Sequence, residues 1–240
     1  MELCSKGFDE VIRSRTACRK YKDQKVDDKL LDLILSETIL APTAHNWQPY
    51  KIVIMKDMAN REMIAKHMPE KNGDVIKQAA GVAVFLSDTD PMNLTQEGRD
   101  FFKSQGMESK IDKMVKMNSL FIGKGGFRRA MMRCLLKNRS NKNWAPEYYT
   151  NREWSIKQTI FPMEQFVLAC QAHGLSTLVM EGFDGRYVAK AINAPKRYFV
   201  TSLVPFGYSD EVGVKPTGRY EPDKLVYNEK FGEGRKTITK

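Results

Sequence analysis

Apolar side chains recur at helical spacing in two stretches of the chain. The clearer stretch predicts a long helix that ends at His173-Gly174, where glycine favours a C-terminal stop. Its apolar face consists of Ile156, Ile160, Met163, Phe166, Val167 and Cys170. A second helix is predicted from a cap at Asp27 or Asp28 to a stop before Pro42. Weaker patterns indicate short helices near residues 8–12, 60–67, 74–79 and 185–192.

Runs of apolar and β-branched residues predict four strands between these helices. They cover residues 50–55, 81–86, 175–180 and 198–205. The first reads YKIVIM between Pro49 and Asp57, and the second reads GVAVFL, which is typical of a buried strand. Neither an internal repeat nor a linker divides the sequence. We therefore expect a single domain over residues 1–240.

Residues 90–154 have weak helical periodicity and are rich in Met, Phe, Lys and Arg. This composition favours a variable lid over a packed core. The charge also sets this segment apart from the rest of the chain, because the net charge of +10 is unevenly distributed. Residues 91–157 carry 14 basic and 6 acidic side chains, whereas residues 1–90 are neutral overall. Residues 215–240 are polar and lack an apolar face that could pack on their own chain.

Several classes of protein and site are disfavoured by the sequence. No apolar run approaches the roughly 20 residues of a membrane span, and no signal-peptide pattern precedes residue 20, so we expect a cytoplasmic protein. The 4 cysteines are far apart without a C-x-x-C pair, and the 3 histidines lack ligand spacing. We therefore expect reduced thiols and no metal site. The hydrolase, zinc-protease and phosphate-loop motifs are absent.

Two polar clusters could bind a ligand. Residues 12–21, IRSRTACRKY, hold four basic side chains at a helix–loop junction. Arginine forks match a phosphate, although a solvated charged face has the same composition. Residues 41–50, APTAHNWQPY, form a proline-bounded loop with two carboxamides. Such a loop could hydrogen-bond the edge of a flat heterocycle, or it could be an ordinary connection.

Together these clusters resemble the FMN-dependent nitroreductase family. Arg15 to Tyr21 follow the start of that family's pattern, and Ala41 to Tyr50 follow its A-P-S-x-x-N-x-Q-P-W motif. A third motif corresponds to residues 168–177 and to Met180-Glu181-Gly182-Phe183. Phe206-Gly207-Tyr208 and the basic residues Lys215 and Arg219 complete the resemblance. It covers residues 8–89 and 155–220 and leaves out the middle segment.

The resemblance implies an α+β fold of three layers, in which helices flank a central, mostly antiparallel sheet. It also implies a homodimer that exchanges its C-terminal tails and binds FMN at the subunit interface. The cofactor-binding residues implied are Arg15, Thr16, Ala17, Arg19, Pro42, Thr43, Ala44, Asn46, Asn72, Met180, Glu181, Gly182, Lys215 and Arg219. Of these, Pro42 to Asn46 would come from the partner chain. Thr16 and Ala17 stand where the family usually has Arg and Ser, which removes one charge.

With FMN bound, the expected activity is reduction of nitroaromatic, quinone or related electrophilic acceptors. NADH or NADPH would donate hydride to the flavin and leave before the acceptor binds. The flavin carries this chemistry, so no residue is assigned as a general acid or base. Arg19 is expected near the pyrimidine edge. The basic lid residues Arg128, Arg129, Arg133, Lys137 and Arg139 would attract the anionic nicotinamide cosubstrate, although a solvated basic helix has the same composition.

Three alternatives remain open from the sequence. The first is a reductive dehalogenase, or a flavin-fragmenting enzyme, of the same fold. Such a dehalogenase would hold a zwitterionic substrate with an acid, a tyrosine and a lysine, for which Glu147 with Tyr148 or Tyr149 are candidates. A protein that binds FMN without turnover is the second. A basic nucleic-acid-binding module is the third, and it is disfavoured because residues 128–142 contain no aromatic side chain.

Overall fold

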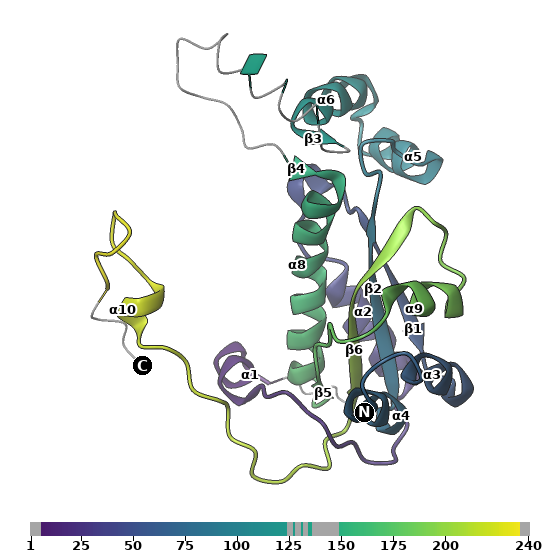
Figure 1. Ribbon diagram of the computed structural model, residues 1–240, viewed down its shortest axis with the longest axis vertical. Helices are drawn as coiled ribbons and strands as arrows, with labels where there is room; N and C mark the ends of the chain where they lie inside the picture. The colour runs from purple at the N-terminus through teal and green to yellow at the C-terminus, as the bar shows by residue number, and fades with distance from the viewer. Residues whose placement is uncertain (1–5, 124–126, 128–130, 132–133, 136–148, 236–240) are drawn as a thin grey trace.

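The computed structural model describes residues 6–123, 127, 131, 134–135 and 149–235, and it places helices on both faces of a central sheet (Figure 1). The strands are β1 (Tyr50–Met55), β2 (Gly81–Asp88), β3 (Ile122–Gly123), β4 (Tyr149–Thr150), β5 (Ser176–Thr177) and β6 (Tyr198–Gly207). The helices are α1 (Phe8–Ser14), α2 (Asp28–Thr38), α3 (Met58–Ala65), α4 (Glu70–Gln78), α5 (Gln96–Ser104), α6 (Glu108–Phe121), α8 (Asn151–Ala172), α9 (Gly185–Ala191) and α10 (Pro222–Leu225), with the short turn η1 (Ala44–Asn46).

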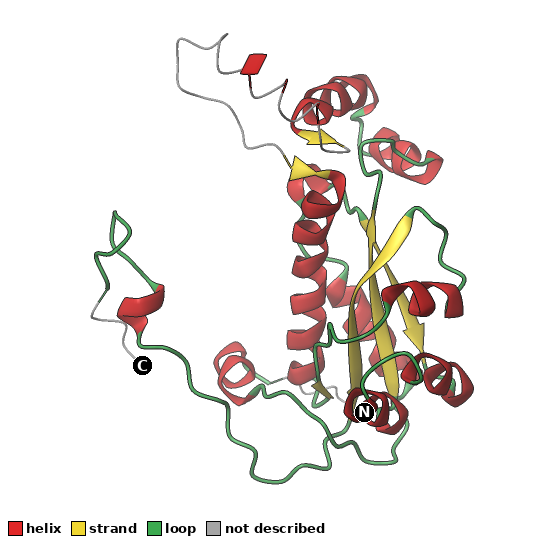
Figure 2. Ribbon diagram, viewed as in Figure 1, coloured by secondary structure: helices red, strands yellow, loops and turns green. Residues whose placement is uncertain are grey.

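The main sheet has the order β1-β2-β6-β5, and each neighbouring pair is antiparallel. Every residue of β2 is buried, because the strand lies between two others and is covered on both faces. A separate parallel pair, β3 and β4, lies at the end of the molecule that carries α5 and α6 (Figure 2). The predicted α+β class and the mostly antiparallel central sheet are confirmed.

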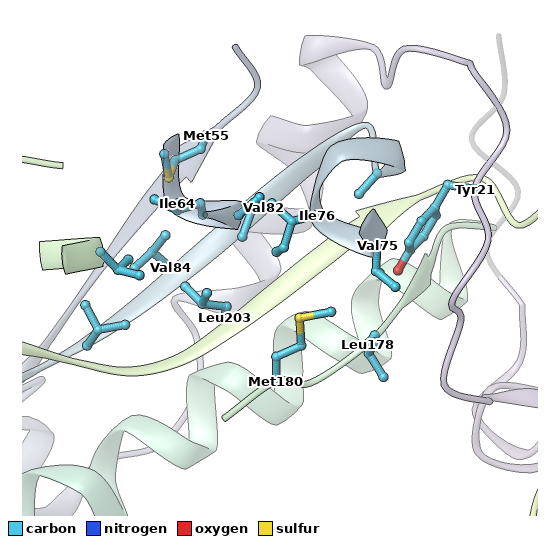
Figure 3. Close-up of a cluster of buried hydrophobic side chains, with 14 of the residues drawn as sticks. Tyr21, Met55, Ile64, Val75, Ile76, Val82, Val84, Leu178, Met180 and Leu203 are labelled. Atoms are coloured by element: carbon cyan, nitrogen blue, oxygen red, sulfur yellow. The ribbon is translucent and has the colours of Figure 1, made fainter. Parts of the chain in front are cut away.

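Side chains alternate between the two faces of β2 and so build two cores. Ala83 and Phe85 pack in a cluster with residues of α2 and α8. Val82 and Val84 point to the opposite face, in a cluster with residues of α3, α4 and α9. Figure 3 shows this second cluster, in which Tyr21 lies beside Val75. The alternation produces the three layers that the resemblance implied.

Helix α8 has 22 residues and is the longest helix in the described part of the chain (Figure 1). It begins earlier than its apolar pattern predicts because Thr150 and Glu153 form a reciprocal capping box. The Thr150 hydroxyl accepts from the Glu153 N–H, and the Glu153 carboxylate accepts from the Thr150 N–H at 2.7 Å. The helix ends at the predicted place, where Gly174 adopts a φ of +79°.

Two expectations from the sequence need correction. The strand predicted at residues 175–180 is regular only at Ser176–Thr177, because afterwards an isolated bridge replaces the ladder to β6. In that bridge the Met180 N–H donates to the Leu203 carbonyl and the Leu203 N–H donates to the Met180 carbonyl. The described part of the lid also has a small core, contrary to expectation. It forms because Trp47, from outside the segment, packs with residues of α5, α6 and α8.

The chain after β6 leaves the sheet and extends away from the body, with α10 near its far end (Figure 1). A bridge between Tyr227 and Gly234 closes a small loop there. Val212, Tyr220 and Phe231 are strongly exposed along this tail. In the described part of the chain, no helix combines the length and apolar character needed to cross a membrane.

Candidate active site

The segment after α1 forms a strap, residues 15–22, that is fixed to the end of the sheet. The Cys18 N–H donates to the Thr177 carbonyl at 3.0 Å, and the Lys22 N–H donates to the Tyr208 carbonyl at 2.9 Å. Cys18 and Tyr21 point inward, and burial raises the pKa of each side chain, so both stay neutral at ordinary pH. The basic side chains of the strap are left on its outer side.

The strap presents cations that have no anionic partner. Arg13, at the end of α1, is already paired with Asp9, whose two carboxylate oxygens accept from its Nε at 2.9 and 3.0 Å. By contrast, the side chains of Arg15, Arg19 and Lys20 have no hydrogen bond or ion pair among the described residues. These free donors can hold an anion such as a phosphate without first breaking an internal ion pair.

The turn that follows β5 supplies further donors. The N–H groups of Glu181 and Gly182 have no acceptor in the described part of the chain. Asn72, from the first turn of α4, donates from Nδ2 to the Gly182 carbonyl at 3.3 Å. A Cβ at Gly182 would lie 3.0 Å from that nitrogen, so a larger residue would require the Asn72 side chain to shift. The turn therefore exposes backbone amides beside a carboxamide.

An aromatic pair, which the sequence did not indicate, borders this turn. The rings of His67 and Tyr187 stack in parallel with centroids 3.9 Å apart, and the Asp184 N–H donates to the His67 carbonyl. The hydrogen bonds from Arg186 lower the pKa of Asp184 to about 2, so its carboxylate is ionised. The stack and the bond to the His67 carbonyl join residues more than 100 positions apart, and no local pattern could have revealed them.

The loop before β1 is held in a strained conformation. His45, Asn46 and Gln48 all have positive φ values, of 54°, 54° and 48°. Non-glycine residues in this region cost about 1–3 kcal/mol each, and surrounding contacts must hold them there. Gln158 of α8 supplies one such contact, because its Oε1 accepts from the Ala44 N–H at 2.7 Å. No motif in the sequence pointed to Gln158.

The strap and this loop lie near opposite ends of α8 within one chain (Figure 1). The Lys6 N–H donates to the Ala172 carbonyl, which places the start of α1 beside the last residue of α8. Gln158 precedes Ala172 by 14 residues, a distance of about 21 Å along a helix. One protomer therefore brings the strap and the Glu181–Gly182 turn to the β5 end, and it holds Ala44 of the loop near the other end of α8.

The tail residues predicted to bind the cofactor make no side-chain hydrogen bond to the strap among the described residues. Arg219 donates from Nη1 to the Thr217 carbonyl at 2.8 Å and to the Gly218 carbonyl at 3.0 Å, within its own exposed segment. Lys215 is exposed and has no side-chain partner among the described residues. The described part of a single chain thus shows no bond between the strap and Lys215 or Arg219, although the tail begins beside the strap, where the Asp210 N–H donates to the Lys20 carbonyl at 3.0 Å.

Part of the predicted lid lies outside the described residues. This applies to the basic residues Arg128, Arg129, Arg133, Lys137 and Arg139, and to Glu147 and Tyr148. Tyr149 is described, and the ammonium group of Lys157 lies 3.9 Å from the centroid of its ring. Within the described ranges, no three histidine, cysteine or acidic residues are grouped as metal ligands would be.

The sequence model of the nitroreductase family matches residues 12–208. The chain belongs to the nitroreductase family. Spy0809 of Streptococcus pyogenes, whose name proposes an NAD(P)H nitroreductase, is 26% identical over 219 residues, which cover 91% of this chain and 98% of that protein. A Thermus thermophilus protein named NADH dehydrogenase is 24% identical over 212 residues, covering 88% and 91% of the two chains.

Solved structures of the nitroreductase family share the fold. A protein from Exiguobacterium sibiricum, solved in complex with FMN, superposes with a TM-score of 0.69 at 18% identity, covering 92% of this chain and 97% of that one. The family resemblance and the fold predicted from the sequence are thereby confirmed. Membership of this family also confirms the predicted class of activity, that of an oxidoreductase.

Proposed function

We propose that the protein is an FMN-dependent enzyme that uses NADH or NADPH to reduce nitroaromatic, quinone or related electrophilic acceptors. Family membership and the FMN complex of the Exiguobacterium sibiricum protein support the cofactor. The names of the Streptococcus and Thermus relatives support the nicotinamide cosubstrate. The two cosubstrates would bind in turn at one site, in ping-pong order.

The observation that carries this proposal is the set of unpaired donors on the strap and the turn. The guanidinium groups of Arg15 and Arg19 fit a phosphate or an anionic ring edge. The free N–H groups of Glu181 and Gly182, with the carboxamide of Asn72, fit the carbonyl and nitrogen edge of a flat heterocycle. FMN combines a phosphate and such a ring in one molecule.

FMN, when bound, would supply the two-electron chemistry at this site. The protein's contribution is to bind, orient and stabilise charge. Arg19 would place a fixed positive charge at the pyrimidine edge and stabilise negative charge there. Thr16 and Ala17 would contact the cofactor beside Arg15, and Met180 would pack under the ring as the turn begins. None of these roles needs a general base.

The proposed site needs two chains. Ala44, in the loop that also holds Pro42, Thr43 and Asn46, is bonded to Gln158, which is about 21 Å along α8 from Ala172 at the end beside α1. In a two-fold dimer, the loop of one subunit can face the strap of the other, because such an interface repeats each contact twice. The proposed assembly is therefore a homodimer with two equivalent flavin sites.

Exchange of the C-terminal tails would complete this dimer. Val212, Tyr220 and Phe231 of the tail are exposed and bury little apolar surface against their own protomer. An apolar cleft of about 520 Å³ lies beside β1, the edge strand of the sheet, and would accept the partner's tail. The exchange would also carry Lys215 and Arg219 toward the partner's phosphate.

Removal of residues 212–240 should weaken dimerisation, and a truncated chain that stays dimeric at micromolar concentration contradicts the exchange.

Mixing two inactive variants tests the divided site. Arg15→Glu damages the strap, and Ala44→Trp blocks the loop, so each homodimer should retain little FMN. An equal mixture that has been unfolded and refolded together forms heterodimers with one intact site each. Because half of the dimers are mixed, it should recover about a quarter of the wild-type FMN content. If the mixture recovers none, the site is not divided between the subunits.

A second candidate function rests on the contact between Lys157 and Tyr149. A cation held over a phenol ring beside the loop matches two parts of a clamp for a zwitterionic substrate, as a reductive dehalogenase requires. Anaerobic assays with a halogenated tyrosine and with nitrofurazone distinguish the two candidates. Halide release with the tyrosine favours dehalogenation, and turnover of nitrofurazone alone favours the main proposal.

A further inference from the structure

Gln158 is buried, with 6% of its surface exposed, yet only half of its carboxamide is used inside the protein. Its Oε1 accepts from the Ala44 N–H at 2.7 Å. A backbone N–H can only donate, so the atom that faces Ala44 must be the oxygen, and the amide cannot be flipped. The NH₂ group, Nε2, is therefore directed away from Ala44.

Nothing in the described part of the chain accepts a hydrogen bond from this Nε2. The atom is also not among the fully enclosed polar atoms that lack a partner, so it keeps some contact with the exterior. An oriented donor on a residue that is more than nine-tenths buried is uncommon, because buried polar groups are usually satisfied. Its position points to a partner that binds from outside.

The loop beside Gln158 is rigidly supported. Trp47 meets Trp154 of α8 edge-on with ring centroids 6.5 Å apart, and its Nε1 donates to the Pro91 carbonyl at 2.6 Å. The Gln48 N–H donates to the Thr43 hydroxyl at 3.1 Å. These contacts hold the left-handed residues of the loop in place and fix the direction of Nε2.

We propose that Gln158 donates a hydrogen bond from Nε2 to the oxygen of the electron acceptor, a quinone carbonyl or a nitro group. The inference rests on the proposed function, in which the acceptor binds between the loop of one subunit and the flavin held by the other. A quinone takes up two electrons and one proton as hydride from the reduced cofactor, and water supplies the second proton. The acceptor oxygen gains negative charge in that step, and a fixed N–H donor stabilises it.

Gln158→Glu tests this role with little change in shape. One carboxyl oxygen keeps the bond from the Ala44 N–H, while the donor is replaced by an oxygen. The oxidation of the reduced protein by menadione should slow by about 10- to 100-fold, the effect of losing one donor to a developing charge. Oxidation by ferricyanide, which offers no carbonyl oxygen, should change less than about twofold.

The pH profile separates a donor from a merely structural residue. Burial raises the pKa of a carboxyl group, and its protonated form is again a donor. The menadione rate of Gln158→Glu should therefore recover as the pH falls, relative to the wild type. Gln165→Glu is the matched control on α8, because the Nε2 of Gln165 already donates to the Glu37 carbonyl. It should show no recovery.

Binding without turnover gives an independent measurement. The oxidised protein is titrated with nitrobenzene and with chlorobenzene, and the flavin absorbance reports binding. Gln158→Glu should raise the Kd for nitrobenzene about tenfold at neutral pH and leave that for chlorobenzene unchanged. Gln158→Met, which loses both polar groups, should weaken nitrobenzene binding at every pH.

The outcomes are distinct. The role of Gln158 would be overturned if the Gln158→Glu protein is yellow, is bleached by NADH, and matches the wild type in its Kd for nitrobenzene and its menadione rate. The proposed function would still stand. A wild-type protein that takes up no FMN would overturn the proposed function itself. An equal loss with menadione and ferricyanide would assign Gln158 to the structure of the loop alone and would also overturn the proposal.

Discussion

Replacement of Arg15 by glutamine should weaken FMN binding specifically through the phosphate. Arg15 is half-buried on the strap, and its guanidinium has no partner among the described residues. Phosphate binding therefore gains the full charge-assisted hydrogen bond, of about 1.5–3 kcal/mol, with no internal ion pair to break. At 1.4 kcal/mol for each factor of ten, the Kd for FMN should rise about 10- to 150-fold.

Arg13→Gln is the matched control, because it removes the same charge two residues earlier on the same segment. Arg13 is already engaged by Asp9 on the surface of α1, and such an exposed pair contributes only about 0.2–1 kcal/mol. Its replacement should change the Kd for FMN by less than about fivefold. Equilibrium dialysis with detection of free FMN fluorescence measures both variants.

Riboflavin distinguishes a phosphate contact from general damage to the strap. It carries the same ring and ribityl chain without the phosphate, so Arg15→Gln should bind riboflavin as the wild type does. A loss of affinity that is equal for FMN and riboflavin would refute the phosphate role. An unchanged Kd for FMN would refute the assignment of Arg15 to the site.

Three further predictions concern the flavin and the stability of the fold. Arg19→Ala should slow reduction by NADH in stopped-flow measurements while FMN content stays normal, and unchanged kinetics would remove its electrostatic role. Arg197→Met should lower the free energy of unfolding in urea by about 3–5 kcal/mol, because it leaves the buried Asp88 carboxylate without the guanidinium that holds it at 2.8–3.0 Å; a loss under 1 kcal/mol would contradict this reasoning. Burial raises the pKa of the Tyr21 phenol. The contribution of this phenol to the free energy of unfolding is therefore full below about pH 10 and is lost as the pH rises further, because it then ionises only in the unfolded chain. The unfolding free energy of Tyr21→Phe should decline less steeply above pH 10, and equal slopes would contradict the assignment.

Local patterns predicted most of the elements because each buried face has its own periodicity. The stripe from Ile156 to Cys170 predicted α8, and the GVAVFL run predicted β2. The strand near residue 178 was predicted too long, since its length depends on bonds to β6 that are set by distant register. The start of α8 was predicted too late because Thr150 and Glu153 act through side-chain capping and not through apolar spacing.

In the candidate site, too, only residues that are neighbours in the sequence could be predicted. The strap around Arg15 could be found in the sequence because its basic residues are neighbours. Gln158 could not, since its partner Ala44 lies 114 positions away and the residue looks like an ordinary polar position on a helix. The stack of His67 on Tyr187 was missed for the same reason. Contacts that depend on the folded chain leave no short pattern to read.

The visible spectrum of the purified protein tests the central claim most directly. The proposed function predicts a yellow protein with flavin absorbance, about one FMN for each chain, and bleaching when NADH or NADPH is added without oxygen. Addition of menadione should then restore the yellow colour. A colourless protein that takes up no FMN, or a yellow one that neither cosubstrate bleaches, would contradict the account.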